Sequence, residues 1–124
     1  IYSMAGSLWR QRLDGATATE LTHPARAYDY QPDAARDGRS VVFARYDGNA
    51  IELWQLDLAS GREQRLTTGG AVNVEPRLSP DGKRIAWVST QGSGHFNLFV
   101  AELDAAGADS TLKCSTLNVE VAQV

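Results

Sequence analysis

A sequence unit of about 45 residues recurs along this chain, and this repeat limits the folds that the chain can adopt. Leu8, Leu53 and Leu98 follow one another at intervals of 45 residues. The same interval relates three aromatic residues and three further leucines, namely Trp9, Trp54 and Phe99, and Leu13, Leu58 and Leu103. Two Leu-Thr pairs extend the register, Leu21-Thr22 and Leu66-Thr67. The repeat predicts stacked copies of one structural unit, with these aromatic residues and leucines in equivalent core positions.

A second repeated block precedes each central apolar run. Residues 32–43 match residues 76–87, and both blocks hold a turn motif. The residues predicted to form these turns are Asp37, Gly38, Ser79, Pro80, Asp81 and Gly82. Pro80 presets φ at about −65°, and Gly82 takes a left-handed conformation at low cost. An aspartate that recurs before glycine is therefore interpreted as a turn residue rather than as a catalytic carboxylate.

The apolar runs between the turns have the character of β-strands. Residues 41–44 and 85–88 are short and rich in β-branched and aromatic side chains. Alternation along 51–58 places apolar side chains on both faces, with Trp54, Leu56 and Leu58 on one and Ile51 and Leu53 on the other. Four strands in about 45 residues, buried on both faces, indicate a blade of a β-propeller. We therefore predict an all-β fold, a β-propeller fragment.

The chain is expected to hold about two and a half to three four-stranded blades in a single partial propeller domain, residues 1–124. Residues 7–22 are assigned to half a blade, 30–67 and 74–112 to one blade each, and 113–124 to an extra strand or tail. A closed propeller needs at least about four blades. We therefore expect the open faces to be covered by the remaining blades of a longer chain or by other copies in a homo-oligomer.

The second turn block and the strands after it resemble the propeller repeat of the TolB family, which is also found in tricorn-type and prolyl-oligopeptidase-type propellers. The resemblance covers roughly residues 6–112. It is carried by Pro76-x-x-Ser79-Pro80-Asp81-Gly82-Lys83-x-Ile85-Ala86-Trp87-x-Ser89, then by Asn97-Leu98-Phe99 and a Leu-Asp hairpin. The 32–45 block departs from it, because Ala35-Arg36 replaces Ser-Pro.

This resemblance implies a non-catalytic protein-interaction and scaffold module of the Gram-negative cell envelope, in the periplasm, with protein partners of unknown identity. The family's partner-contact residues are not carried over onto positions of this chain. The alternative is an access-gating propeller portion of a larger hydrolase, a prolyl-oligopeptidase-like peptidase or an amidohydrolase. Sequence beyond Val124 would separate the two. Binding of a sugar or small ligand in the channel is a third reading.

Composition and motifs argue against several other classes. The net charge of −3 disfavours nucleic-acid and anionic-membrane binding. No apolar stretch approaches the ~18 residues of a membrane span, and the chain as given has no signal peptide. Gly92-Ser93-Gly94 lacks the spacing of a nucleophile elbow, and the single Cys114 forms no internal disulfide or cysteine zinc site. No catalytic residue, cofactor or metal is predicted.

Three carboxylates remain as candidates for a contact surface. Asp29, Asp33 and Glu75 lie near the entry to the first strand of a blade. In a ring these entries line one end of the channel, so the group is either a solvated loop or a polar patch for a protein partner. His23 and His95 are interpreted as loop residues. The outer-strand arginines are interpreted as solvated, namely Arg10, Arg12, Arg62 and Arg65.

Overall fold

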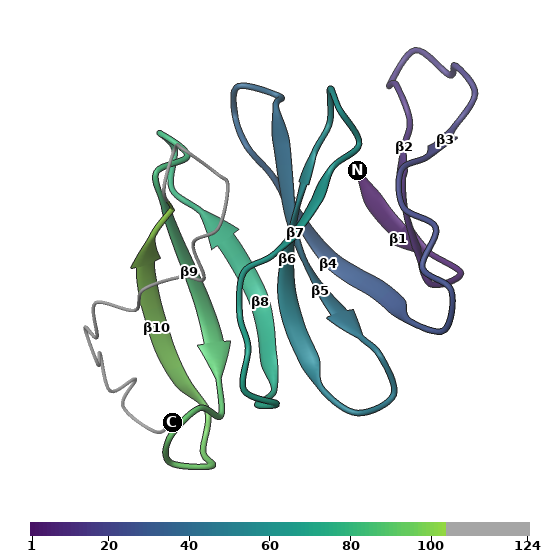
Figure 1. Cartoon of the computed structure of the whole chain (residues 1–124). Coiled ribbons are helices and arrows are strands. Elements are labelled where there is room, and N and C mark those ends of the chain that lie inside the picture. Colours follow the sequence, from purple (N-terminus) through teal and green to yellow (C-terminus); the bar gives the residue numbers. More distant parts are fainter. Residues whose placement is uncertain (104–124) are drawn as a thin grey trace.

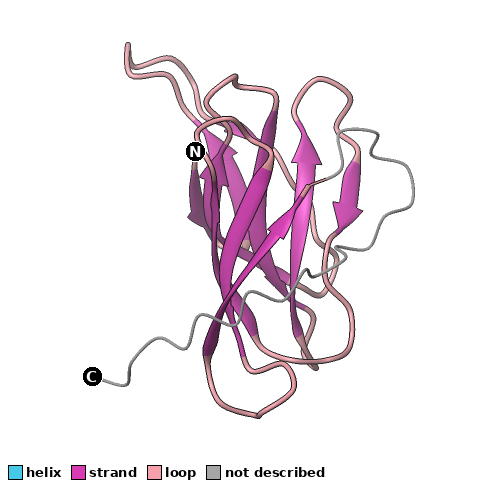
Figure 2. Cartoon of the chain, turned by 90° about the vertical axis from the view of Figure 1, so that its left-hand side faces the viewer, coloured by secondary structure: helices cyan, strands magenta, loops and turns pink. Residues whose placement is uncertain are grey.

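The computed structural model describes residues 1–103, which form three antiparallel sheets in chain order (Figures 1 and 2). The first sheet contains β1 (Tyr2–Met4), β2 (Ser7–Arg10) and β3 (Thr19–Glu20). The middle sheet contains β4 (Tyr28–Ala34), β5 (Ser40–Tyr46), β6 (Ile51–Asp57) and β7 (Glu63–Arg65). The third sheet contains β8 (Asn73–Leu78), β9 (Arg84–Ser89) and β10 (Asn97–Glu102). In the part described, no helix has the length and apolarity to cross a membrane.

The three sheets stand side by side, as consecutive blades of a propeller do (Figure 1). Within each sheet the strands pair in chain order, so every sheet is an up-and-down meander. Strand β4 contacts β1 and β2 of the first sheet, and β8 contacts β4, β5 and β6 of the middle sheet. The all-β propeller-fragment fold predicted from the repeat is confirmed. The extra strand or tail predicted for 113–124 lies outside the described residues.

A cross-strand aromatic pair occupies the same place in each sheet. Trp9 pairs with Tyr2, Trp54 with Phe43, and Phe99 with Trp87. Directly opposed side chains on neighbouring antiparallel strands share one face and pack together. The rings of Trp87 and Phe99 stack with centroids 5.7 Å apart. The 45-residue spacing of Trp9, Trp54 and Phe99 therefore reflects one structural position in three successive sheets.

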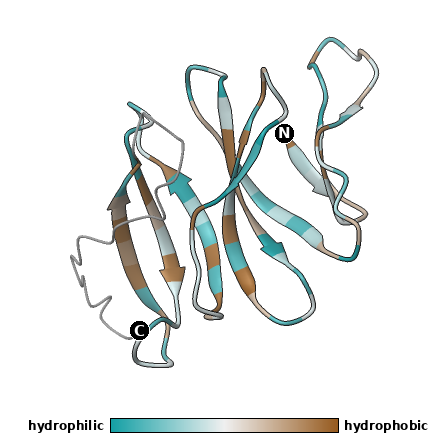
Figure 3. Ribbon diagram, viewed as in Figure 1, coloured by the Kyte–Doolittle hydropathy of each residue, from teal (hydrophilic) through white to brown (hydrophobic). Residues whose placement is uncertain are grey.

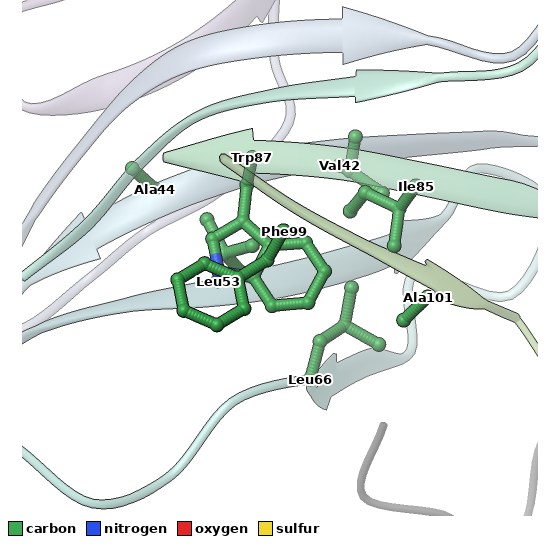
Figure 4. Close-up of a cluster of buried hydrophobic side chains, with 8 residues drawn as sticks. All are labelled: Val42, Ala44, Leu53, Leu66, Ile85, Trp87, Phe99 and Ala101. Atoms are coloured by element: carbon green, nitrogen blue, oxygen red, sulfur yellow. The ribbon is translucent and has the colours of Figure 1, made fainter. Parts of the chain in front are cut away.

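Two apolar clusters lie between neighbouring sheets. The cluster between the first and middle sheets is built from Leu8, Val41, Phe43 and Leu56, with Leu21, Trp54 and Leu58 packed against it. The cluster between the middle and third sheets is built from Val42, Ala44, Leu53, Leu66, Ile85, Trp87, Phe99 and Ala101, with Tyr30, Ile51, Leu78 and Leu103 at its margin (Figure 4). The middle sheet is thus apolar on both faces, and the apolar residues are found mainly on strands (Figure 3).

The first sheet differs in two ways from what the repeat predicts. It contains β1 as a partner for β2, in addition to the strands assigned to 7–22. Leu13, which the repeat places in the core, is fully exposed. The equivalent residues Leu58 and Leu103 are held because their N–H groups donate to the carbonyls of Arg39 and Lys83. No such turn precedes β1 among residues 1–103, so Leu13 lies in the loop after β2 without that anchor.

The Leu-Thr pairs close the outer edge of two sheets in the same way. The Leu21 N–H donates to the Leu8 carbonyl at 2.7 Å, and the Leu8 N–H donates to the hydroxyl of Thr22 at 3.0 Å. In the middle sheet, the Leu53 N–H donates to the Thr67 hydroxyl at 2.9 Å. Each threonine hydroxyl therefore continues the ladder for one more bond while the preceding leucine packs between sheets.

The predicted turn residues lie in equivalent tight turns. The Gly82 N–H donates to the Ser79 carbonyl at 2.9 Å, and φ of Gly82 is +71°. In the middle sheet the Gly38 N–H donates to the Ala35 carbonyl, and φ of Gly38 is +72°. Asp81 accepts from the N–H of Lys83, as Asp37 accepts from the N–H of Arg39. The turn therefore keeps its geometry where Ala35-Arg36 replaces Ser-Pro.

Two phenylalanines near β10 provide a test of the stacking. Phe99→Ala removes a ring that is only 6% exposed in the cluster between sheets, whereas Phe96 is 57% exposed. We expect Phe99→Ala to lower the free energy of unfolding by about 3–5 kcal/mol and Phe96→Ala by about 0.5 kcal/mol or less, measured by urea denaturation. Equal losses for the two variants would contradict this packing.

Candidate functional site: the first-strand edge

The first strands of two neighbouring sheets, β4 and β8, lie side by side and carry matching irregularities. The register of β4 against β5 shifts between Tyr30 and Asp33, and that of β8 against β9 shifts between Val74 and Arg77. Each shift is a β-bulge, and each contains a proline, Pro32 or Pro76. Proline has no N–H to donate, so a bulge on an edge strand is where it is tolerated.

The residue before each proline has a strained backbone. φ is +52° at Gln31 and +54° at Glu75, in the left-handed region that non-glycine residues seldom adopt. Such a conformation costs about 1–2 kcal/mol and persists because the surroundings hold it. Strained backbone of this kind is found at binding sites more often than elsewhere, so we treat this edge as the candidate contact site.

Side chains of β4 hold the backbone of β8 in place. The Glu75 N–H donates to the amide oxygen of Gln31 at 2.8 Å, and the Leu78 N–H donates to the carboxylate of Asp33 at 2.7 Å. These partners are 44 and 45 residues apart, the length of the repeat itself. The two bonds join adjacent first strands that share no backbone ladder. Asp33, predicted as a candidate contact residue, therefore has a structural role.

Glu75 differs from Gln31, its counterpart in the preceding sheet. Its side chain is exposed, and its carboxylate forms no hydrogen bond or ion pair within residues 1–103. The charge therefore stands on a strained and anchored segment of backbone, with its hydrogen-bonding capacity available to a ligand or to a further blade.

Asp29, the third predicted carboxylate, lies in the interior instead of on the contact edge. It is fully buried, and its two oxygens accept from Nε and Nη2 of Arg45 at 2.6 and 2.9 Å. Arg45 also donates to Glu63 at 2.8 Å, and its guanidinium lies 4.6 Å from the centre of the Trp54 ring. Burial by itself lowers the pKa of Arg45, but hydrogen bonds to Asp29 and Glu63 raise it above its ordinary value. Asp29 is therefore a structural anion.

A second buried polar group was not foreseen from the sequence. The Glu52 carboxylate is almost fully buried and accepts from the Thr67 hydroxyl, the Gly70 N–H and the side-chain amide of Asn73. The oxygen of that amide in turn accepts from the indole N–H of Trp87 at 3.1 Å. This network fixes the connection between β7 and β8, where the edge begins. The sequence signal for this group was Glu52 itself, an acidic residue near the start of a largely apolar strand.

The other polar candidates do not converge on the edge. His23 is exposed and lies 3.3 Å from Glu20, and His95 is exposed in the loop before β10. Arg12 pairs with Asp14 on the surface, and Arg65 lies near Glu52. Among residues 1–103, no group of three or more His, Cys, Asp or Glu side chains has the arrangement of a metal site. Cys114 lies outside the described residues.

Known proteins similar in sequence and known proteins similar in structure point to the same relatives. The chain matches no protein-family model. It is 34% identical over 88 residues to the Tol-Pal system protein TolB of Francisella tularensis subsp. tularensis (strain WY96-3418), and equally to that of subsp. holarctica (strain OSU18). Each match covers 70% of this chain and 19% of the relative. The chain therefore spans about a fifth of the length of the curated relatives it matches.

Solved structures show the same likeness. A protein of Agrobacterium tumefaciens provisionally assigned as TolB superposes with a TM-score of 0.69 at 25% identity, over 84% of this chain and 38% of that one. TolB from Acinetobacter baumannii superposes with a TM-score of 0.70 at 24% identity, over 80% of this chain and 24% of that one. The second likeness establishes the fold alone.

Two arginines distinguish the buried ion pair from a surface one. Arg45→Met leaves the Asp29 carboxylate without its partner in the interior, whereas Arg12→Met breaks a pair that is exposed on both sides. We expect Arg45→Met to lower the free energy of unfolding by about 3–5 kcal/mol and Arg12→Met by at most about 1 kcal/mol, measured by chemical denaturation at pH 7. If Arg45→Met cost no more than Arg12→Met, Asp29 would have to be solvated.

Proposed function

We propose that this chain is part of a non-catalytic protein-interaction module of the bacterial cell envelope, working in the periplasm with the Tol-Pal system. The support is the likeness to TolB proteins in sequence and fold, together with the exposed Glu75 carboxylate on the first-strand edge. Neither the relatives nor the described residues 1–103 favour the alternative of a gating propeller in a hydrolase.

One observation supports placing the contact at Glu75. Glu75 lies in the β8 bulge with a φ of +54°, and its side-chain carboxylate is exposed. Its backbone N–H donates to the side-chain oxygen of Gln31. The backbone that carries this side chain is already held, so only the side chain of Glu75 has to become ordered on binding, which favours affinity. Its partner should present a basic side chain or backbone N–H groups.

The preceding sheet supplies the matched substitution. Gln31 occupies the same repeat position and the same left-handed backbone, so a glutamine amide fits there. We expect Glu75→Gln to keep the fold and to weaken binding to the Tol or Pal protein of the source organism about fivefold, because only the charge is lost. Biolayer interferometry with the immobilised 124-residue chain measures this.

Glu102→Gln is the control, because Glu102 is also exposed but lies at the end of β10. It should bind as the unmodified chain does. Absence of binding by the unmodified chain to every Tol and Pal protein would overturn the proposed function. Full binding by Glu75→Gln would overturn only the placement of the contact at this edge.

A further inference from the structure

A polar cleft of about 650 Å³ lies between the middle and third sheets, at the end where the tight turns gather. Its walls come from the β4–β5 turn, the β6–β7 hairpin and the β8–β9 turn, which share the upper end of Figure 1. Such a volume falls within the range of small-ligand sites, roughly 300–1,000 Å³. The cleft is separate from the first-strand edge, where the contact through Glu75 is proposed.

The carboxylates at the rim are occupied by their own turns. Asp57 accepts from the N–H groups of Ala59 and Ser60 at 3.1 and 2.8 Å. Asp81 accepts from the Ser79 hydroxyl and the Lys83 N–H, and Asp37 accepts from the N–H of Arg39. The N–H and hydroxyl of Ser60 lower the pKa of Asp57, and the Ser79 hydroxyl and then the Lys83 N–H lower that of Asp81. These short side chains are turned toward the backbone.

The three cations of the cleft lie on backbone that is held by hydrogen bonds, and their side chains form no ion pair within residues 1–103. Arg39 and Lys83 follow the Asp-Gly of equivalent turns, and their carbonyls accept from the N–H groups of Leu58 and Leu103. The third cation, Arg62, comes from the hairpin between these turns. None of the three forms an ion pair with another residue in 1–103. Formal charges at the rim balance, but the long cationic side chains keep their donors available while the carboxylates are engaged.

Two side-chain amides line the middle-sheet wall of the cleft. Gln55 and Gln64 are opposed across β6 and β7, and both are half-buried. The residue equivalent to Gln55 in β10 is Val100, so the fold does not require a polar side chain at this position of the repeat. Neither amide bonds to another side chain within the described part of the chain. Amide groups of this kind can donate to and accept from a peptide backbone.

From these observations we infer that the cleft binds an acidic peptide segment of a protein partner, with Arg39, Arg62 and Lys83 receiving its carboxylates and Gln55 and Gln64 its backbone. The whole chain carries a net charge of −3, so a general attraction for acidic peptides is not expected. Binding of such a peptide therefore requires a local donor site.

Fluorescence anisotropy with the 124-residue chain tests this inference. The probe is a short fluorescein-labelled peptide of alternating glutamate and serine, and its counterpart alternates lysine and serine. We expect saturable binding of the glutamate peptide only, weakened when NaCl rises from about 0.05 to about 0.5 M. The variant Arg39→Gln/Arg62→Gln/Lys83→Gln should weaken it at least about tenfold, since each exposed charge pair contributes a modest factor.

The matched control removes three arginines of the first sheet and its loops, as Arg10→Gln/Arg12→Gln/Arg26→Gln, and should bind the peptide within about twofold of the unmodified chain. Circular dichroism checks that both triple variants fold. Equal losses in the two variants, equal binding of the lysine peptide, or no saturable binding of the glutamate peptide would each overturn the inference. Glu75→Gln should bind the acidic peptide normally, so this result is independent of the first-strand contact.

Discussion

Burial of sheet faces against neighbouring sheets is the interaction on which the rest of this structure depends. The middle sheet is apolar on both sides, with Phe43 facing one neighbour and Leu53 the other. A meander of this size has no stable form with both faces in water, because about 25 cal/mol is lost for each Å² of apolar area left exposed. The sheets therefore stack, and every polar site described above takes its position from that stacking.

Polar groups then fix how the stacked sheets meet. The side chains of Gln31 and Asp33 reach backbone N–H groups about one repeat further along the chain, and Glu52 binds the connection that leads into β8. Hydrophobic packing is not directional, whereas these hydrogen bonds fix the relative position of the sheets. They hold the first-strand edge, where the contact is proposed, in one conformation, and a preformed surface favours binding.

The repeat made the fold predictable, because residues that recur at a fixed interval must occupy equivalent places. It also identified the tight turns, whose geometry follows from Asp-Gly. It was wrong for Leu13, since the backbone anchor that holds Leu58 comes from a turn that the first sheet lacks within residues 1–103. The site was less accessible to sequence reasoning. Asp29 and Glu75 are both carboxylates near a strand entry in the sequence, and only the structure shows that Asp29 is buried in an ion pair with Arg45.

Nuclear Overhauser contacts between methyl and aromatic protons test the stacking of the sheets most directly. The account predicts cross-peaks from the methyl groups of Leu53 and Leu66 in the middle sheet to the rings of Trp87 and Phe99 in the third (Figure 4). Cross-peaks between the Trp87 and Phe99 rings serve as the internal reference, because this pair lies within one sheet. If the reference peaks are present and those between the sheets are absent, the stacking described here is contradicted.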